Sequence, residues 1–542
     1  MNRIIIVFYL GFILFSLSSC TQPVRGKSAQ DEKPNVVFFL VDDLGWSDVG
    51  CYGSTFYETP NIDQFAQEGV RFTNAYAACH VCSPTRASIL TGKYPATLHL
   101  TDWLPGRRNF PFQKLLNAEI NQHLPFEEVT IAEALKKHGY RTAIFGKWHL
   151  GDTPSDPLHH GFDMHIPKNW NYCCPPRSGY RAPWELEGLD CVEGDYLTDR
   201  LTDEALKYIE ENKEMPFFLY LSHFAVHDPI DGRSDLVEKY KKKLANQPQQ
   251  NGPDFILEGN PDNPENPTRE ELNQLMKLPE YADTYKSYPN DLVKIKQKQD
   301  NVEFAAMVES VDESLGRVLS KLKELGLEDN TIVIFFSDNG GMSAANFGNP
   351  KRVISDSSLD KAYSTSNLPL RGGKGWLYEG GIREPLIVKW PHEVRKGTVC
   401  EVPVISTDFL PTILDMLRLP IPNENKLDGV SIVPLLKGKK EIDRKAIYWH
   451  FPHYSNHGMQ SPGGAIREGD YKLLEYFENG TVQLFNLKED IGEQNDLSKI
   501  EVEKTRELKA KLDKWREEVG AQMMKPNPDY DPSTDLWAGE NK

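Results

Sequence analysis

The sequence predicts an α/β fold in which helices flank a largely parallel sheet, followed by a smaller C-terminal subdomain built on an antiparallel sheet. Two observations predict it: short apolar runs alternate with helical segments over most of the chain, and a strong hairpin signal stands near its C-terminal end. The 542 residues suit one large domain with a smaller one, since single cores stop growing at roughly 250–300 residues.

The candidate strands are almost continuously apolar instead of alternating in polarity. Such runs indicate strands buried on both faces, as in a sheet covered by helices. Two of the candidate helices stop at a glycine, Gly139 and Gly326, as helices often do. The strands are expected at residues 35–41, 142–145, 217–221, 331–336 and 386–390, and the helices at residues 130–138, 198–212 and 302–325.

The main domain is expected to span residues 34–440, and the C-terminal subdomain residues 441–542. Residues 228–300 interrupt the main pattern with clustered Asp, Asn, Pro, Gln and Lys, which predicts a loop-rich insertion that is substrate-facing or mere surface decoration. In the C-terminal part, Asn479-Gly480 between two apolar runs is the hairpin signal. Residues 500–519 are typical of an amphipathic helix that covers the sheet.

The N-terminal residues are typical of an export signal, with Arg3 before an apolar run that ends in small residues. The final Leu-Ser-Ser-Cys resembles a bacterial lipobox, which makes residues 1–19 a lipoprotein signal peptide, Cys20 the lipidated residue and residues 20–33 a tether. A plain cleaved signal or an uncleaved anchor are the alternatives. We therefore expect an exported cell-envelope lipoprotein, in the periplasm or on the outer surface, attached to the membrane only through its lipid anchor.

The formal charge of −17 argues against a nucleic-acid partner, because such proteins carry basic faces. An anionic substrate would need a locally basic pocket. Six of the eight cysteines have no predicted role, and in an exported protein they could pair in 15 ways. They are Cys51, Cys79, Cys173, Cys174, Cys191 and Cys400.

Oxygen-bearing side chains follow two predicted strands. Asp42 and Asp43 come directly after the first strand, and Asp338 and Asn339 follow the strand at 331–336. Open α/β sheets place their sites at the carboxyl ends of strands, and a set of oxygen ligands favours Ca²⁺ or Mg²⁺ over zinc. Each pair alone could equally cap a turn.

The most specific motif begins at Cys82. Cys82-Ser83-Pro84-Thr85-Arg86 is followed by four residues and Thr-Gly, and this pattern resembles the complete signature of the sulfatase family, of the alkaline-phosphatase-like superfamily. The resemblance implies that a maturation enzyme oxidises Cys82 to formylglycine (3-oxoalanine), whose hydrated aldehyde is the nucleophile. The alternatives are a redox pair or half a zinc site formed with Cys79. Neither explains the rest of the signature.

Sulfate-ester cleavage has chemical needs that this nucleophile meets. The ester is already charged, so attack requires an activated oxygen, neutralised sulfate oxygens and a protonated leaving group. A hydrated aldehyde has a second hydroxyl, which can expel the sulfate by re-forming the aldehyde.

Further motifs resemble the same family from residue 34 to about residue 497. Gly-Lys-Trp-His ends at His149, and the late lysine motif contains Lys374; His227 is the candidate general acid. Glu384 before Pro385 departs from the family pattern without touching a catalytic position. The resemblance implies a calcium site of Asp42, Asp43, modified Cys82, Asp338 and Asn339, and a sulfate pocket of Arg86, Lys147, His149, His227 and Lys374.

The substrate is expected to be a sulfated saccharide. Trp103 and Arg107 lie soon after the nucleophile and could grip a sugar by stacking and hydrogen bonding; a packed loop is the alternative. A lipidated sulfatase of this kind resembles those that bacteria use on algal polysaccharides, such as ulvan or carrageenan, or on host glycan fragments.

Two other functions stay open at this point. A phosphodiesterase or phosphonate hydrolase of the same superfamily would share the fold and the strand-end carboxylates, but its two-metal members need extra zinc ligands where this chain has Lys147 and Lys374. An inactive glycan-binding lipoprotein would use the same pocket without turnover. The intact Cys82 argues against it.

Overall fold

The computed structural model describes residues 33–171, 173–176, 178–248, 251–263, 267–282, 292–345, 362–422 and 426–534. The predicted signal peptide, Cys20 and all of the tether but its last residue lie outside the described residues. Pro34–Lys542 forms one compact unit. No helix in the described ranges combines the length and the apolar character that a membrane span requires.

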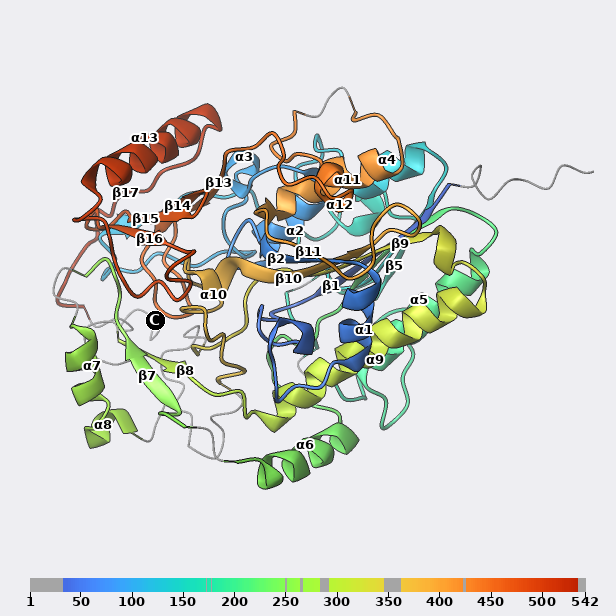
Figure 1. Ribbon diagram of the computed structural model, residues 1–542, viewed down its shortest axis with the longest axis horizontal. Coiled ribbons are helices and arrows are strands. Elements are labelled where there is room, and N and C mark those ends of the chain that lie inside the picture. Colours follow the sequence, from blue (N-terminus) through green and yellow to red (C-terminus); the bar gives the residue numbers. More distant parts are fainter. Residues whose placement is uncertain are drawn as a thin grey trace, which may run out of the picture. The chain divides into compact units, whose positions relative to one another are not determined.

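The main sheet is mixed and mostly parallel, which confirms the predicted fold class (Figure 1). Its centre is β1 (Asn35–Val41), which pairs in parallel with β6 (Phe217–Ser222) and β9 (Thr331–Ser337). Antiparallel β10 (Arg383–Lys389) follows β9. The other strands are β2 (Val70–Tyr76), β4 (Arg141–Gly146), β5 (Met164–Ile166), β11 (Thr398–Cys400) and β12 (Val404–Ile405), in the order β11-β2-β10-β9-β1-β6-β4-β5 with β12 beside β2.

Helices cover both faces of this sheet, as the apolar strands predict. Along β1, alternate side chains enter two different cores, because successive residues of a strand point to opposite faces. Val37 and Phe39 pack on the face covered by α1 (Pro60–Glu68), α5 (Leu197–Glu211), α6 (Ser234–Asn246) and α9 (Val302–Glu324). Val36 and Phe38 pack on the face of α2 (Cys82–Thr91), α4 (Ile131–Lys137), α11 (Phe409–Met416) and α12 (Val433–Leu436).

The insertion is more regular than the loop-rich segment that its composition predicts. It contains α6, the antiparallel pair β7 (Phe255–Glu258) and β8 (Val293–Lys296), and the short helices α7 (Arg269–Leu275) and α8 (Pro279–Ala282). The apolar face of α6 buries Leu236 and Tyr240 in the core beside α9. This narrow apolar face is obscured in the sequence by the polar residues around it.

The C-terminal part has the predicted antiparallel sheet and covering helix. Strands β13 (Ala446–Phe451), β14 (Gly463–Glu468), β15 (Tyr471–Tyr476) and β16 (Val482–Asn486) pair in sequence order, and α13 (Val502–Glu518) packs Leu508 and Leu512 into their core. Trp376 of the main domain belongs to the same core. The remaining short elements are α3 (Pro95–Leu98), α10 (Glu379–Ile382) and the pair β3 (Leu115–Leu116) with β17 (Lys525–Pro526).

Of the cysteines whose pairing the sequence left open, Cys173 and Cys174 form a disulfide. Cys51, Cys79, Cys191 and Cys400 are free thiols, as is Cys82.

Candidate active site

The carboxyl ends of β1 and β9 bring the predicted metal ligands together. Val41 pairs with Ser337 in the sheet register, so the residues that follow the two strands are neighbours. The Asp43 N–H donates to Asp338 Oδ1 (3.2 Å), and Asn339 Nδ2 donates to Asp43 Oδ1 (2.7 Å). Asp43 has a left-handed backbone (φ 61°), a conformation that few residues other than glycine adopt, Asp and Asn among them.

This group of side chains fits a hard cation. Asp42 Oδ1 and Asn339 Oδ1 are buried without a hydrogen-bond partner, and a buried oxygen left unpaired is costly. Burial and the neighbouring Asp338 carboxylate raise the pKa of Asp42 above its usual value, the direction expected where carboxylates are crowded together. The free oxygens are carboxylate and amide oxygens, the donors that Ca²⁺ prefers.

Cys82 is the first residue of α2 and is buried. Its Sγ lies 3.2 Å from His149 Nδ1, and the positive end of the α2 dipole favours negative charge at this position. Arg86, one turn along the same helix, is also buried. The helix thus holds both ends of the Cys82–Arg86 motif at the edge of the sheet.

His149 is held with its δ nitrogen toward Cys82. Its Nε2 lies 2.9 Å from the Leu104 carbonyl, which can only accept, so Nε2 carries a proton. Burial and the Lys147 ammonium hold the pKa of His149 well below its usual value. The ring is therefore neutral, with Nδ1 free to accept a hydrogen bond from the group at position 82. Like Asp43, His149 has a left-handed backbone (φ 57°).

The three predicted sulfate-binding cations lie against the three carboxylates. Lys147 Nζ is 2.6 Å from Asp42 Oδ2, and Lys374 Nζ is 2.7 Å from Asp43 Oδ2. The Arg86 guanidinium is 2.7 Å from Asp338 Oδ2. Arg86 also donates to the Ser222 hydroxyl (2.6 Å) and the Lys147 carbonyl (3.1 Å). Every one of these charged side chains is at most 3% exposed, and Cys82 is an electrostatic neighbour of both Arg86 and Lys374.

His227 is positively charged at neutral pH. Burial and Lys374 act to lower its pKa, but the carboxylates of Asp43, Asp42 and Asp228 outweigh them and raise the pKa of His227 to about 9. Its Nδ1 lies 2.9 Å from Asp228 Oδ1, and its Nε2 lies 3.7 Å from Asp43 Oδ2. An imidazolium in this place can attract sulfate and supply a proton.

One other metal-binding set is geometrically possible. Asp42, Asp43 and His227 each offer an atom within 4.8 Å of the others. His227 Nδ1 is already engaged with Asp228 Oδ1 (2.9 Å), and a hard cation prefers oxygen ligands to an imidazole nitrogen. The oxygen set of the two strand ends is therefore the better fit.

The substrate candidates lie on one loop beside Cys82. The buried Asp102 carboxylate accepts the N–H groups of Trp103 (2.8 Å) and Arg107 (3.1 Å), and the Leu104 N–H donates to Ser83 Oγ (3.1 Å). Trp103 is partly buried against Phe451. Arg107 donates to the Ser455 carbonyl (2.8 Å) and lines a hollow of about 280 Å³.

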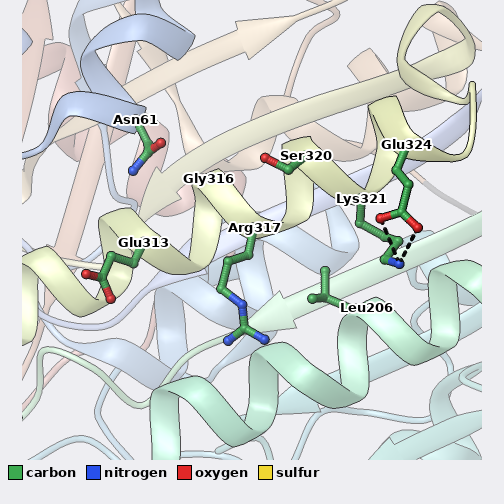
Figure 2. A pocket seen from close by; sticks show the side chains of 8 residues that line it. All are labelled: Asn61, Leu206, Glu313, Gly316, Arg317, Ser320, Lys321 and Glu324. Carbon is green, nitrogen blue, oxygen red and sulfur yellow. Dashed lines mark hydrogen bonds and ion pairs between the residues drawn. The ribbon is translucent and has the colours of Figure 1, made fainter.

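A hollow of about 440 Å³ between α5 and α9 lies apart from these residues (Figure 2). Glu313 pairs with Arg233 (2.7 Å), Lys321 with Glu324 (3.0 Å), and Arg317 with Asp203. None of the predicted site residues lines it. It is a groove lined by ion-paired side chains.

Comparison with known proteins identifies the family. The sulfatase family profile matches residues 34–419, and the profile described as N-sulphoglucosamine sulphohydrolase, C-terminal, matches residues 373–520. The chain belongs to the sulfatase family and is an enzyme that hydrolyses sulfate esters. It is 29% identical to a sulfatase of Formosa agariphila over 91% of this chain and 88% of that one. It is 27% identical to N-acetylglucosamine-6-O-sulfatase of Bacteroides thetaiotaomicron, over 97% and 92%.

Solved structures share the fold. The crystal structure of Ps i-CgsB matches with a TM-score of 0.65 at 27% identity, over 90% of this chain and 93% of that one; the same protein is known in complex with k-i-k-neocarrahexaose. Phosphonate monoester hydrolase of Agrobacterium radiobacter matches with a TM-score of 0.58 at 20% identity, which shows only that its fold is the same.

Sequence reasoning missed the residues that orient the predicted ones. Ser222 binds Arg86, and the Leu104 carbonyl fixes the tautomer of His149. Asp228 binds His227 and directly follows it in the chain. A carboxylate next to the candidate general acid was therefore a signal from which this partner could have been predicted. His457 of the C-terminal subdomain, near Lys374, had no such signal.

Proposed function

We propose that this protein removes an O-sulfate from a sulfated carbohydrate, using a formylglycine made from Cys82 and a bound calcium ion. The observation that carries the proposal is the convergence of Cys82, an oxygen-ligand cluster and three buried cations at one end of the sheet. Sulfate-ester cleavage needs a nucleophile, charge neutralisation and a proton donor, and the described residues supply all of them.

Calcium would be held by Asp42, Asp43, Asp338 and Asn339, together with the modified residue 82. A cation held there would supply positive charge for the sulfate group. The unpartnered Asp42 Oδ1 and Asn339 Oδ1 support this assignment.

The protein's own side chains divide the remaining work. Neutral His149 accepts a hydrogen bond at Nδ1 and so orients the nucleophile at position 82. Arg86, Lys147 and Lys374 place positive charge where the sulfate oxygens gain negative charge. His227, protonated through Asp43, Asp42 and Asp228, gives its proton to the departing sugar oxygen.

A hydrated aldehyde at position 82 supplies the attacking oxygen, and its second hydroxyl provides the means of releasing sulfate. The formylglycine-generating maturation enzyme is thus a required partner. One metal site of oxygen ligands, with basic side chains beside it, favours sulfate-ester hydrolysis. A zinc-dependent phosphodiesterase or phosphonate hydrolase would need nitrogen and additional carboxylate ligands.

The substrate class is a sulfated saccharide of algal or host origin. Support comes from the relatives, because one is named for N-acetylglucosamine 6-O-sulfate and another is known with a bound neocarrahexaose. Trp103 and Arg107 lie on the loop that Asp102 holds, and Leu104 of that loop bonds Ser83, the residue after Cys82.

We also propose that Cys20 carries a lipid that anchors the mature enzyme in the cell envelope, facing the periplasm or the outside. Metabolic labelling with palmitate tests this: label should enter the wild-type protein and not Cys20→Ser. Equal labelling of both would contradict the anchor.

The activity is tested with protein made beside a formylglycine-generating enzyme. Hydrolysis of 4-methylumbelliferyl sulfate and of at least one sulfated saccharide is expected, and Cys82→Ala should lose both. Undiminished turnover by Cys82→Ala would refute the nucleophile. Saccharide binding by fully converted protein, with no turnover of either substrate, would favour the inactive glycan-binding lipoprotein.

A further inference from the structure

The segment 454–461 of the C-terminal subdomain reaches the candidate active site. It packs on the residues after Lys374: a Cβ placed on Gly375 would lie 2.4 Å from His457 Cβ, and one placed on Gly458 would lie 1.6 Å from Trp376 Nε1. The Gln460 side chain accepts the Leu377 N–H (2.6 Å). These contacts fix the segment against the loop that carries a predicted sulfate-binding lysine.

His457 links this segment to the candidate active site. Its electrostatic neighbours are Lys374, Asp43, Asp228 and His227. It is 6% exposed, and both of its ring nitrogens lack a hydrogen-bond partner among the described residues. A buried polar group without a partner calls for an explanation, and a ligand that completes its hydrogen bonds is one.

His457 is suited to a sugar hydroxyl. Burial and the Lys374 ammonium lower its pKa to about 3, so the ring is neutral, with one nitrogen donating and the other accepting. A hydroxyl also donates and accepts. An anionic group would instead be met by the lysines and His227.

Both ends of the same segment, Tyr454 and residues 459–461, line the hollow of about 280 Å³. Arg107 joins its wall to the segment by donating to the Ser455 carbonyl. Asn260 of the insertion joins it by donating to Ser461 Oγ (2.7 Å). The volume is below the roughly 300–1,000 Å³ of complete small-molecule pockets, so the hollow fits one part of a larger ligand.

The residues that line the hollow indicate which part of the ligand it binds. Three aromatic residues, Phe112, Tyr454 and Tyr530, line it, and aromatic side chains are the groups against which the C–H faces of a sugar pack. Amide and hydroxyl groups between them match sugar hydroxyls. One guanidinium, Arg107, is balanced by one carboxylate, Glu478, so the hollow has no excess charge for a second sulfate.

We propose that the hollow is a glycan subsite that holds an uncharged pyranose next to the sulfated sugar, and that His457 hydrogen-bonds the sulfated sugar itself. The inference rests on the proposed saccharide sulfatase activity and adds to it a preference for substrates in which an uncharged sugar neighbours the sulfated one. It also gives the insertion and the C-terminal subdomain a shared part in substrate selection.

The test compares matched substrates on formylglycine-containing enzyme. The disaccharides of κ-carrageenan and keratan sulfate are set against galactose 4-sulfate and N-acetylglucosamine 6-sulfate. For at least one pair, kcat/KM should be higher for the disaccharide by roughly 5- to 30-fold, the factor that one contact of ordinary strength carries. Tyr530→Ala, which truncates a side chain 39% exposed, and Met459→Trp, which fills the hollow, should each bring that ratio close to one.

His457 is tested by the ratio of kcat/KM for the saccharide to that for 4-methylumbelliferyl sulfate, which has no sugar. His457→Ala should lower this ratio at least fivefold, mainly through KM, and His457→Gln, which keeps a donor and an acceptor, should restore part of it. The matched control is His450→Ala, in the same subdomain, where the ring contacts the Gln522 carbonyl; its ratio should equal that of the wild type.

Each outcome decides between the two proposals. Cleavage of mono- and disaccharides with equal efficiency, or an advantage that persists in Tyr530→Ala and Met459→Trp, would overturn the subsite and leave the proposed function standing. Hydrolysis of 4-methylumbelliferyl sulfate with no saccharide cleaved would overturn the saccharide activity and the subsite with it. An unchanged ratio in His457→Ala would overturn the role of His457.

Discussion

Neutralising Lys147 is expected to lower both stability and turnover. Its Nζ lies 2.6 Å from Asp42 Oδ2, and both side chains are 0% exposed. Removing one partner of a buried pair leaves the other charge uncompensated, at a cost of about 3–5 kcal/mol. Removing a charge that acts on the transition state commonly lowers kcat by roughly 100- to 1,000-fold. Lys147→Met keeps the length of the side chain and should show both losses.

Urea unfolding measures the first loss, and kcat for 4-methylumbelliferyl sulfate measures the second. The matched control is Lys241→Met, because Lys241 pairs with Glu238 at 2.8 Å but both side chains are more than half exposed. Exposed pairs contribute little, so neither the unfolding midpoint nor kcat should change appreciably. A kcat for Lys147→Met within threefold of the wild type would refute the catalytic role.

A double variant separates the two effects. Lys147→Met/Asp42→Asn removes both charges of the pair, so part of the lost stability should return, while kcat should stay low. If kcat recovers together with stability, the loss in the single variant came from misfolding.

Three further predictions follow from the site and its supports. Prolonged chelation should abolish activity and lower the melting temperature, and calcium should restore both; substantial zinc in the purified enzyme would contradict the oxygen site. Asp228→Asn removes a negative charge beside His227, so the pKa of His227 should fall and the alkaline limb of the kcat profile should move to lower pH; an unmoved limb would show that another group supplies the proton. Glu258→Gln weakens the ion pairs with Arg269 and Arg371, both at 2.7 Å, and should lower the free energy of unfolding by about 1.5–3 kcal/mol. The control is Glu238→Gln, which removes an exposed ion pair and should leave the unfolding midpoint unchanged.

The central strands could be predicted because burial on both faces leaves a mark in the sequence. β1 and β9 are apolar along almost their whole length and are buried throughout. β2 was missed because polar residues such as Arg71 and Asn74 interrupt it. The edge strands β11 and β12 are two or three residues long, and their pairing with β2, not their own pattern, makes them strands.

The candidate site, like the fold, has parts that could be predicted from the sequence and parts that could not. Motifs that are contiguous in the chain, such as the one from Cys82 to Arg86, could be read directly. Partners that depend on the fold could not: the Leu104 carbonyl meets His149 across 45 positions of sequence, and His457 reaches Lys374 from another subdomain. The roles of Trp103 and Arg107 on saccharides remain predictions, since their contacts are those of a well-held loop.

The chemical state of residue 82 is the most direct test of the account. Mass spectrometry of the tryptic peptide containing Cys82, taken from active enzyme, should show a loss of about 18 Da, because formylglycine has one oxygen in place of the sulfur and two hydrogens of cysteine. The account predicts that the converted fraction rises in proportion to specific activity across preparations. An unmodified thiol throughout a preparation that hydrolyses sulfate esters would contradict it.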